Sequence, residues 1–457
     1  MRLPLSLAVT ALGATLYDAD GAPDDVHVST DTRTLQPGDT FVALTGERFN
    51  GHDYTAEAVK RGAAMLVVDE ADARVHGTAT LLVDRTRLAY MSLAGVAREQ
   101  FKGRVIAITG SAGKTTTKAF LTQLLGVRFG DRVAVSPANE NNEIGVSKLL
   151  LRASNDEHDV IVVEMGARQF GDIATLVGLA KPEVGILTNI GDAHLEIMGS
   201  RDRLAETKWA LFANGARAVL NADDSQSIAR AELLPHPPHW FAARPDGSGI
   251  PLGHATALIG TSRLIDVQTG NTREIAVDVG VPGMHNRANA AAAIAGALEL
   301  GVELEAMPDT IAKLRLPQGR FESFATPGGW RIIYDAYNAN ASGTIAALDA
   351  FAMEKPERGI AVLGSMAELG DESARLHERV GAHAAKRADV LLLGGDYADA
   401  MERGAQGAGL SKQLIVRFDA NSDVVRWLRE HARRGDVVLL KGSRKYAMEH
   451  IVEELLS

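Results

Sequence analysis

The chain alternates short apolar runs with segments in which apolar residues recur at helical spacing. Short runs of apolar and β-branched residues, bounded by glycine, proline or charged residues, are typical of buried strands. We expect strands at 40–46, 63–70, 79–84, 104–109, 159–166, 183–191, 216–223, 330–337, 359–366, 388–395 and 435–443. Strands that alternate with helices in this way predict an α/β fold with mainly parallel sheets.

Three other stretches have distinct patterns. The alanine-rich segment 284–300 favours a helix. The apolar residues of segment 5–16 are spaced as in a small amphipathic first helix. The stretch from about 235 to 284 is rich in proline and glycine, so we expect it to be irregular.

The length of the chain predicts several domains. At 457 residues it is too long for one hydrophobic core, and about three domains are expected. We place a small N-terminal α/β domain at 1–100, with a boundary near 98–103, and a central P-loop ATPase-like domain with a mainly parallel sheet at 101–314. The third domain, at 315–457, has the strand and helix order of a Rossmann-like fold but lacks the dinucleotide-binding glycine pattern.

Composition narrows the functional classes. The formal net charge of -10 argues against a nucleic-acid-binding or anionic-membrane surface. The absence of cysteine excludes a disulfide framework and a thiolate zinc site. No apolar run is long enough to span a membrane, and Pro4, Thr10 and Gly13 interrupt the first one, which favours a helix over a signal peptide. We therefore expect a cytoplasmic protein.

The segment AITGSAGKTTTKAF, residues 107–120, combines a strand end, a glycine turn and a helix start. Its pattern of Gly110, Gly113, Lys114 and Thr115 is shorter than the standard P-loop, because the first glycine of that motif is missing. A strand–turn–helix unit directs backbone N–H groups and a helix N-terminus at a phosphate. Lys114 can then reach the β- and γ-phosphates, and the Thr115 hydroxyl can reach a magnesium ion. A glycine turn beside a solvated lysine is the less favoured reading.

Charged residues near strand ends are candidates for a metal site. Glu164 ends one apolar strand and His194 follows the next, and the carboxyl ends of parallel strands share one edge of a sheet. Glu164 fits a metal ligand or a salt-bridge partner equally well, whereas the shared edge favours a functional His194. Periodicity alone places Lys208 on the solvent-facing side of a helix.

Two polar segments are candidates for substrate contacts. Segment 136–145 contains Asn139, Asn141 and Asn142, and a helix cap explains one such asparagine but not three. Segment 334–340 places a carboxylate, a ring and amides at a strand end, where packing does not require them.

Taken together, these motifs resemble those of one family. The chain resembles the Mur ligase family, in order and over nearly its whole length, through TGSAGKTTTK, NENNEIG, VVEMGA, NIGDAHLE, PGMHNRANA, GRFE, DAYNAN, GSMAELGDES and LKGSRKYAMEHIV. The resemblance implies an ATP-dependent amide-forming enzyme of peptidoglycan assembly. The motifs at the front, STDTRTLQPGDTFVALTGERFNGHDY, and at the back are most similar to those of members that join D-alanyl-D-alanine to UDP-N-acetylmuramoyl-tripeptide.

The resemblance also implies residue roles. It assigns ATP binding to Gly110, Ser111, Ala112, Gly113, Lys114, Thr115, Thr116, Asn286, Asn289, Arg320 and Asp335. It assigns the UDP, muramyl-peptide and amine substrates to Thr32, Arg33, His52, Asn139, Asn141, Asn142, Tyr337, Asn338, Lys441, Ser443 and Arg444. It assigns catalysis to Lys114, Glu164, His194 and Lys208, and two magnesium ions to Thr115, Glu164, His194 and Lys208. In this role Lys208 is carbamylated by CO2 and acts as a carboxylate, which reverses the reading from periodicity.

The implied mechanism passes through an acyl phosphate. The γ-phosphoryl group of ATP is transferred to the tripeptide carboxylate, and the amine of the dipeptide then displaces phosphate. Four residues depart from the family pattern: Ala112 replaces the usual asparagine of the loop, Ala138 a glycine, Ser147 a proline, and Asn50 the aspartate often found beside His52, which leaves the contacts of His52 open. The alternatives are another ligase of the family, which adds a single amino acid or a glutamate tail to folate, and a nucleotide-switch ATPase. We expect a monomer with small-molecule substrates, without nucleic acid or membrane insertion.

Overall fold

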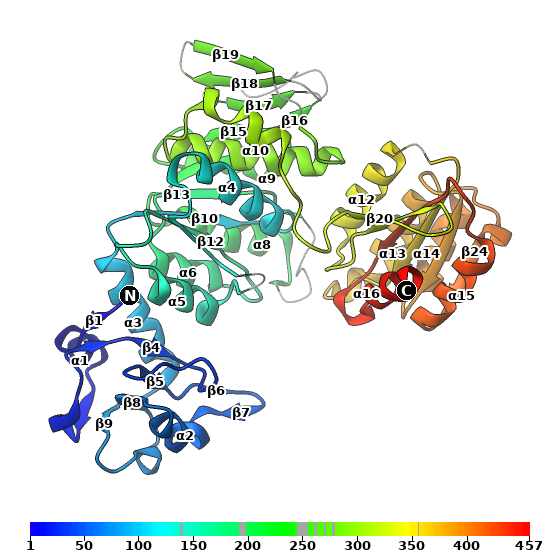
Figure 1. Ribbon diagram of the computed structural model, residues 1–457. Helices are drawn as coiled ribbons and strands as arrows, with labels where there is room; N and C mark the ends of the chain where they lie inside the picture. The colour runs from blue at the N-terminus through cyan, green and yellow to red at the C-terminus, as the bar shows by residue number, and fades with distance from the viewer. Residues whose placement is uncertain are drawn as a thin grey trace. The chain divides into compact units, whose positions relative to one another are not determined.

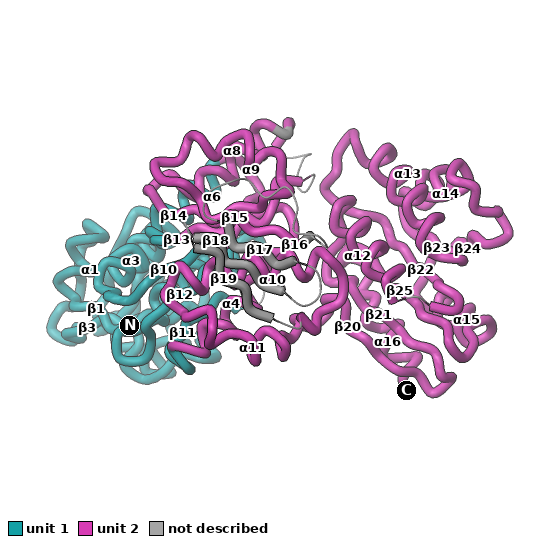
Figure 2. The backbone as a smooth tube through the Cα atoms, turned by 90° about the horizontal axis from the view of Figure 1, so that it is seen from above, with its two compact units in different colours: residues 1–107, 129–166, 171–183 teal, residues 108–128, 167–170, 184–457 magenta. Residues whose placement is uncertain are grey.

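The computed structural model describes residues 1–137, 140–191, 198–244, 255–259, 263–268, 271–276, 279–354 and 356–457. The chain forms two compact units, shown in Figure 2. The first comprises residues 1–107, 129–166 and 171–183, and the second comprises residues 108–128, 167–170 and 184–457. Figure 1 labels many of the helices and strands.

The first unit contains a five-stranded sheet. Its order is β2 (Thr15–Tyr17), β9 (Ala79–Leu82), β8 (Met65–Val68), β5 (Thr40–Val42) and β4 (Val28–Ser29). The strands from β9 to β4 are parallel, and β2 is antiparallel to β9. The surrounding helices are α1 (Leu5–Leu12), α2 (Thr55–Lys60) and α3 (Thr86–Gln100), and short strand pairs are formed by β1 (Leu3–Pro4) with β3 (Asp25–Val26) and β6 (Thr45–Gly46) with β7 (Phe49–Asn50).

The rest of the first unit carries the strand that ends in Glu164. Strand β12 (Val160–Glu164) pairs in parallel with β11 (Val133–Val135), and all five residues of β12 are buried. Helices α5 (Glu143–Arg152) and α6 (Asp172–Ala180) precede and follow it in this unit. Strand β10 (Arg104–Thr109) begins in the first unit, and its last two residues belong to the second.

The second unit contains a sheet that changes from parallel to antiparallel. Strands β13 (Val184–Leu187), β14 (Arg217–Asn221), β15 (His239–Phe241) and β17 (Ala255–Ile259) pair in parallel, as does β16 (Ala243–Arg244) with β17. Strands β18 (Arg263–Gln268) and β19 (Asn271–Ala276) extend it as an antiparallel meander. The helices here are α4 (Lys114–Phe129), α8 (Arg201–Trp209), α9 (Ser225–Arg230), α10 (Met284–Glu299) and α11 (Pro308–Ala312).

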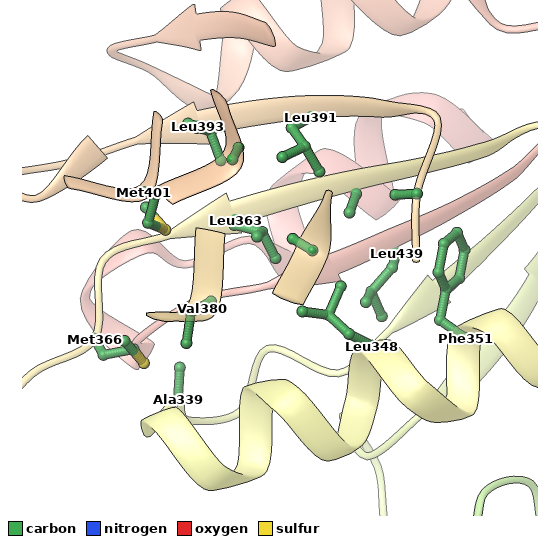
Figure 3. Packing of buried hydrophobic residues seen from close by; sticks show 14 of the residues in the cluster. Ala339, Leu348, Phe351, Leu363, Met366, Val380, Leu391, Leu393, Met401 and Leu439 are labelled. Carbon is green, nitrogen blue, oxygen red and sulfur yellow. The ribbon is translucent and has the colours of Figure 1, made fainter. Parts of the chain in front are cut away.

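The C-terminal part of this unit has its own six-stranded sheet. The order is β20 (Glu322–Ala325), β21 (Arg331–Tyr334), β25 (Val437–Lys441), β22 (Gly359–Gly364), β23 (Val390–Gly394) and β24 (Ile415–Phe418), all parallel except β20. Buried residues of α12 (Ala341–Met353), α13 (Ser373–Ala384) and α14 (Ala398–Gly407) pack on one face (Figure 3). Helices α15 (Asn421–His431) and α16 (Glu449–Leu456) pack on the other. Strands covered on both faces read as continuous apolar runs, which is why the sequence pattern located them.

Most predicted elements are confirmed, and one region is not. The structure has a strand inside each predicted strand range, and α10 matches the predicted alanine-rich helix. The prediction of an irregular region at 235–284 is wrong where β15 to β19 lie. These strands are short and lie among proline and glycine residues, and β18 and β19 are antiparallel, so their pattern is weaker than that of the long buried parallel strands.

Candidate active site

The glycine turn predicted from the sequence lies between β10 and α4. Gly110 and Gly113 both have positive φ values, 151° and 83°. A Cβ atom on Gly110 would lie 1.9 Å from Thr188 Oγ1, and one on Gly113 would lie 2.2 Å from Asn289 Oδ1. Any other residue would therefore displace neighbouring atoms at both positions, so both glycines of the predicted motif are required by the turn.

The start of α4 is suited to an anion. Its first turn contains Lys114, Thr115 and Thr116 and no acidic residue, and its buried face carries Phe120, Leu121, Leu124 and Leu125. The ammonium group of Lys114 donates to Gly110 O at 2.8 Å, so it lies over the turn. A helix N-terminus with a cation beside it attracts negative charge. This segment is therefore compatible with the predicted phosphate-binding role.

Two residues predicted for ATP lie on α10 beside this turn. Asn289 is 8% exposed, and its Oδ1 accepts a hydrogen bond from Thr117 Oγ1 at 3.4 Å. The side chain of Asn286 is fixed by its donation to Pro282 O at 2.9 Å. The structure thus brings Asn289 to the glycine turn, 172 residues away in sequence from the Thr117 that it contacts.

Replacement of Gly113 by alanine tests the shape of the turn. Because a Cβ atom would overlap Asn289 and the positive φ costs about 1–2 kcal/mol, we expect the affinity for ADP to fall at least about tenfold. Isothermal titration calorimetry measures this effect. Gly126→Ala is the matched control, since Gly126 lies in α4 with nothing within 4 Å of an added Cβ, and it is expected to leave ADP binding unchanged. Unchanged ADP affinity in Gly113→Ala would contradict the assignment.

Glu164 ends β12, as predicted, and its carboxylate is held in place. The residue is 2% exposed, its N–H donates to Ser136 Oγ at 3.1 Å, and its Oε1 accepts a bond from Asn141 Nδ2 at 3.0 Å. Asn141 is in turn packed against Gly166, whose N–H donates to Asn141 O at 2.8 Å. The first unit therefore joins two of the predicted residues, Glu164 and Asn141, in one contact.

Other predicted residues of this region have a different local role or are not described. Asn142 is the N-cap of α5, and its Oδ1 accepts the N–H of Gly145 at 2.9 Å. Its contact with substrate stays a prediction. Asn139 and His194 lie outside the described residues, so the structure does not place them.

The prediction from periodicity that Lys208 faces solvent is wrong. The side chain is 1% exposed, although it is a lysine on a polar helix. It lies four residues after Leu204 and three before Leu211, both fully buried, and so occupies the buried stripe of the helix. Burial, and after it the positive charge of Lys114, hold the pKa of Lys208 well below its ordinary value.

A buried ion pair organises the predicted residues of the C-terminal sheet. Lys441 Nζ donates to Asp335 Oδ2 at 2.7 Å and to Asn338 O at 3.0 Å. Asp335 Oδ1 accepts the N–H of Phe321 at 3.3 Å, and Phe321 has a positive φ of 51°. Burial lowers the pKa of Lys441, while Asp335 opposes that shift. The expectation that packing does not require this segment is wrong for Asp335, which balances a buried ammonium group.

The remaining predicted residues of this sheet differ in exposure. Arg320 lies over the ring of Tyr337, with its guanidinium carbon 4.6 Å from the ring centre. Ser443 is buried, whereas the side chain of Arg444 is 62% exposed and pairs with Glu449 at 2.9 Å. Arg320 and Tyr337 therefore form one surface, on which a ring or an anion can bind.

The predicted UDP-binding residues lie in the first unit. The exposed Arg33 side chain donates three hydrogen bonds to the carboxylate of Asp31, at 2.9, 3.2 and 2.6 Å, and lowers the pKa of Asp31 to about 2. Thr32 lies between them in sequence. His52 is buried, with Nδ1 2.7 Å from Asn50 Oδ1 and Nε2 2.9 Å from Asp69 Oδ1. Asn50 thus makes the contact to His52 that its departure from the family pattern had left open.

Sequence reasoning missed two residues that touch the glycine turn. Thr188 and Asn189 follow β13 directly, and both hydrogen bond to Ala112. Both lie in the run read as one strand, 183–191, although β13 ends at Leu187. Polar residues at the end of an apolar strand were the available signal, as they were for Glu164.

Comparison with known proteins gives matches along most of the chain. Three family descriptions match in succession: Mur ligase family, catalytic domain, at 26–96; Mur ligase middle domain at 108–297; and Mur ligase, glutamate ligase domain, at 319–444. Among the described residues, no helix combines the length and the apolar character needed to cross a membrane.

Individual relatives match with high coverage. The UDP-N-acetylmuramoyl-tripeptide–D-alanyl-D-alanine ligase of Escherichia coli is 36% identical, over 100% of this chain and 98% of its own. The structure of MurF from Acinetobacter baumannii matches with a TM-score of 0.86 and 28% identity, over 100% of this chain and 99% of its own. MurF ligase from Thermotoga maritima in complex with ADP matches with a TM-score of 0.80 and 28% identity, over 94% of this chain and 96% of its own. The similarity extends over the whole chain and not over single motifs.

Proposed function

The chain belongs to the Mur ligase family, and from this premise we propose that it joins D-alanyl-D-alanine to UDP-N-acetylmuramoyl-tripeptide at the expense of ATP. The observation that carries the proposal is similarity to a relative of this activity over the full chain. The products are the UDP-N-acetylmuramoyl-pentapeptide, a peptidoglycan precursor, together with ADP and phosphate. We propose that residues 1–100 bind the UDP-sugar, 101–314 bind ATP, and 315–457 close over the nucleotide and the amine.

The reaction has two steps. A carboxylate oxygen of the tripeptide attacks the γ-phosphorus of ATP, the bond from that phosphorus to the β-phosphate oxygen breaks, and ADP leaves. The neutral amine of the dipeptide then attacks the carbonyl carbon of the acyl phosphate. The carbon–oxygen bond to phosphate breaks, the nitrogen loses a proton, and the amide remains. Exclusion of water protects the acyl phosphate from hydrolysis between the steps.

The glycine turn supplies the phosphate contacts of this scheme. The turn leads into the N-terminus of α4, whose dipole favours an anion, and the Lys114 ammonium balances negative charge as one anion approaches another. Asn286 and Asn289 serve the adenine side, and Arg320 and Asp335 serve phosphate and ribose. Asn289 contacts Thr117 and so lies beside the glycine turn. This position supports the proposed role of Asn289 in binding the nucleotide.

The remaining assignments concern the other substrates. Thr32, Arg33 and His52 hold the UDP group, and Asn139, Asn141 and Asn142 contact the muramyl peptide. Residues of the C-terminal sheet serve the amine substrate: Tyr337, Asn338, Lys441, Ser443 and Arg444. The buried pair with Asp335 supports an indirect role for Lys441, which shapes the turn around Asn338.

Two magnesium ions complete the proposed site. The donor set fits: Thr115 offers a hydroxyl oxygen, and Glu164 offers a carboxylate that accepts a hydrogen bond from Asn141 at the end of β12. His194 and a carbamylated Lys208 are the other proposed ligands. When bound, magnesium supplies positive charge that lowers the repulsion between phosphate and carboxylate.

Lys208 is suited to carbamylation by CO2. CO2 reacts with a neutral amine, and the burial of Lys208 beside a second lysine favours the neutral form. Carbamylation converts this buried amine into a carboxylate, which is the type of ligand that magnesium prefers. The catalytic group then consists of Lys114, Glu164, His194 and Lys208.

Product analysis tests the proposed function. The protein is incubated with ATP, magnesium, UDP-N-acetylmuramoyl-tripeptide and, in separate reactions, D-alanyl-D-alanine, D-alanine or L-glutamate. We expect mass spectrometry to show the pentapeptide only with the dipeptide, with one ADP and one phosphate for each new amide. Addition of a single amino acid would identify another ligase of the family, and ATP hydrolysis without an amide would identify a nucleotide switch.

We also propose that the enzyme acts as a cytoplasmic monomer. Size-exclusion chromatography with light scattering tests the oligomeric state, and cell fractionation tests the localisation.

A further inference from the structure

Thr188, at the end of β13, bonds to the glycine turn through its side chain. Its hydroxyl donates to Ala112 O at 2.6 Å, and its N–H donates to Thr109 O at 3.0 Å. A Cβ atom added to Gly110 would lie only 1.9 Å from this hydroxyl oxygen, which is too close for two non-bonded atoms. Gly110 therefore allows Thr188 to approach the turn closely enough to hold it.

Asn189 makes a more complete contact with the same turn. Its main-chain oxygen accepts the N–H of Ser111 at 3.0 Å. Its side-chain Oδ1 accepts the N–H of Ala112 at 3.1 Å, and its Nδ2 donates to Ala112 O at 3.2 Å. The amide of Asn189 thus binds both backbone groups of one residue, as a neighbouring strand would.

These contacts fix the middle of the turn. The N–H groups of Ser111 and Ala112 both donate to Asn189. Asn189 therefore binds two successive residues of the turn to the segment that follows β13.

Further hydrogen bonds hold the main chain around these two residues and the turn. Asn221, at the end of β14, donates from Nδ2 to Thr188 O at 3.0 Å. The N–H of Gly191 donates to Ser111 Oγ at 2.9 Å. The contact between the turn and the segment after β13 therefore does not rest on Thr188 and Asn189 side chains alone.

We propose that Thr188 and Asn189 are positioning residues that hold the glycine turn in its nucleotide-binding shape before a nucleoside diphosphate or triphosphate arrives. The proposal rests on the proposed function only in assigning the nucleotide to this turn. Without these contacts, nucleotide binding has to order the turn, and the cost of ordering lowers affinity. We therefore expect the affinity for the nucleotide to fall and the affinity for the amine substrate to stay unchanged.

Asn189→Ala is the first test, with magnesium and ADP as the probe in calorimetry. Removal of two hydrogen bonds to Ala112 is expected to raise the Kd for ADP about tenfold or more. In the ligase assay, KM for ATP rises by a similar factor, while KM for D-alanyl-D-alanine stays the same. Asn155→Ala is the matched control, because the Asn155 side chain also makes two hydrogen bonds to main-chain groups, to Lys102 N and Gln100 O, before the start of β10. It is expected to bind ADP normally.

Thr188 provides a second test that does not depend on the first. Thr188→Val removes the hydroxyl at nearly constant volume and is expected to weaken ADP binding several-fold, and Thr188→Ser is expected to regain most of the affinity. Wild-type ADP affinity in both Asn189→Ala and Thr188→Val would overturn the proposal. Equal changes in KM for ATP and for D-alanyl-D-alanine would also overturn it, since they indicate general destabilisation. The ADP titration remains informative if the ligase reaction itself is not observed.

Discussion

Replacement of Lys114 by alanine is expected to abolish ligase turnover, with a fall in kcat/KM on the order of 10³-fold or more. The first step brings a carboxylate to a triphosphate, and charge repulsion between them opposes the attack. The Lys114 ammonium lies over the glycine turn, 2.8 Å from Gly110 O, and is placed to balance charge on the phosphates. Alanine preserves helix α4 and removes only the charged side chain. The loss of turnover is therefore expected to come from the missing charge and not from misfolding.

The measurement is the rate of ADP release in the complete ligase mixture, with folding checked by circular dichroism. Lys313→Ala is the matched control, since Lys313 is exposed at the end of α11, and its activity should equal that of the wild type. Lys114→Arg is also expected to be impaired, because a planar guanidinium does not replace a compact ammonium in a narrow turn. Turnover in Lys114→Ala within about tenfold of the wild type would refute the assignment of the glycine turn to ATP.

The elements that the sequence located best are those buried on both sides. Strand β22 lies within the predicted run 359–366, and all six of its residues are buried. Such strands appear in the sequence as continuous apolar runs, and turn residues mark both ends of each run. The glycine turn was also predicted correctly, because its residue types at fixed spacing follow from backbone geometry and not from distant contacts.

Roles that depend on distant residues were not accessible in the same way. Asn189 acts on Ala112, which is 77 residues away, and its place after an apolar strand marks it as a candidate without showing which residue it contacts. Asn142 shows the reverse case. It was grouped with residues for substrate, and the structure gives it an N-cap bond to Gly145. Asparagine suits turns, caps and ligand contacts equally well, so only the fold separates these roles.

Lys208 shows how an average over a helix can hide one position. Helix α8 is polar as a whole, and a lysine in it reads as solvent-facing. However, Leu204, Lys208 and Leu211 follow one another at helical spacing, and all three are buried. Lysine is almost never fully buried without a compensating partner or a chemical function. A charged residue at a position that continues a line of apolar residues along a helix therefore predicts a buried residue with a function.

Replacement of Lys208 by alanine is expected to lower kcat at least about a hundredfold, and a short carboxylate such as formate or acetate should restore part of the activity. The reason is that the substitution removes the proposed carbamate and leaves a buried space of nearly a lysine side chain. A small anion can enter that space and provide the missing carboxylate. Lys208→Met is the matched control, because methionine fills the space, so activity should be lost without rescue.

Removal of CO2 tests the same chemistry in the unmodified protein. Wild-type activity should fall when CO2 is stripped from the buffer and return on addition of bicarbonate, with a carbamate signal in ¹³C spectra of the labelled protein. Only the neutral amine reacts with CO2, so this recovery should weaken as the pH falls through the pKa of Lys208, which burial and Lys114 have lowered. Recovery then persists to lower pH than an ordinary lysine would allow. Full activity of Lys208→Ala without added carboxylate would show that the reaction does not require a carboxylate at this position.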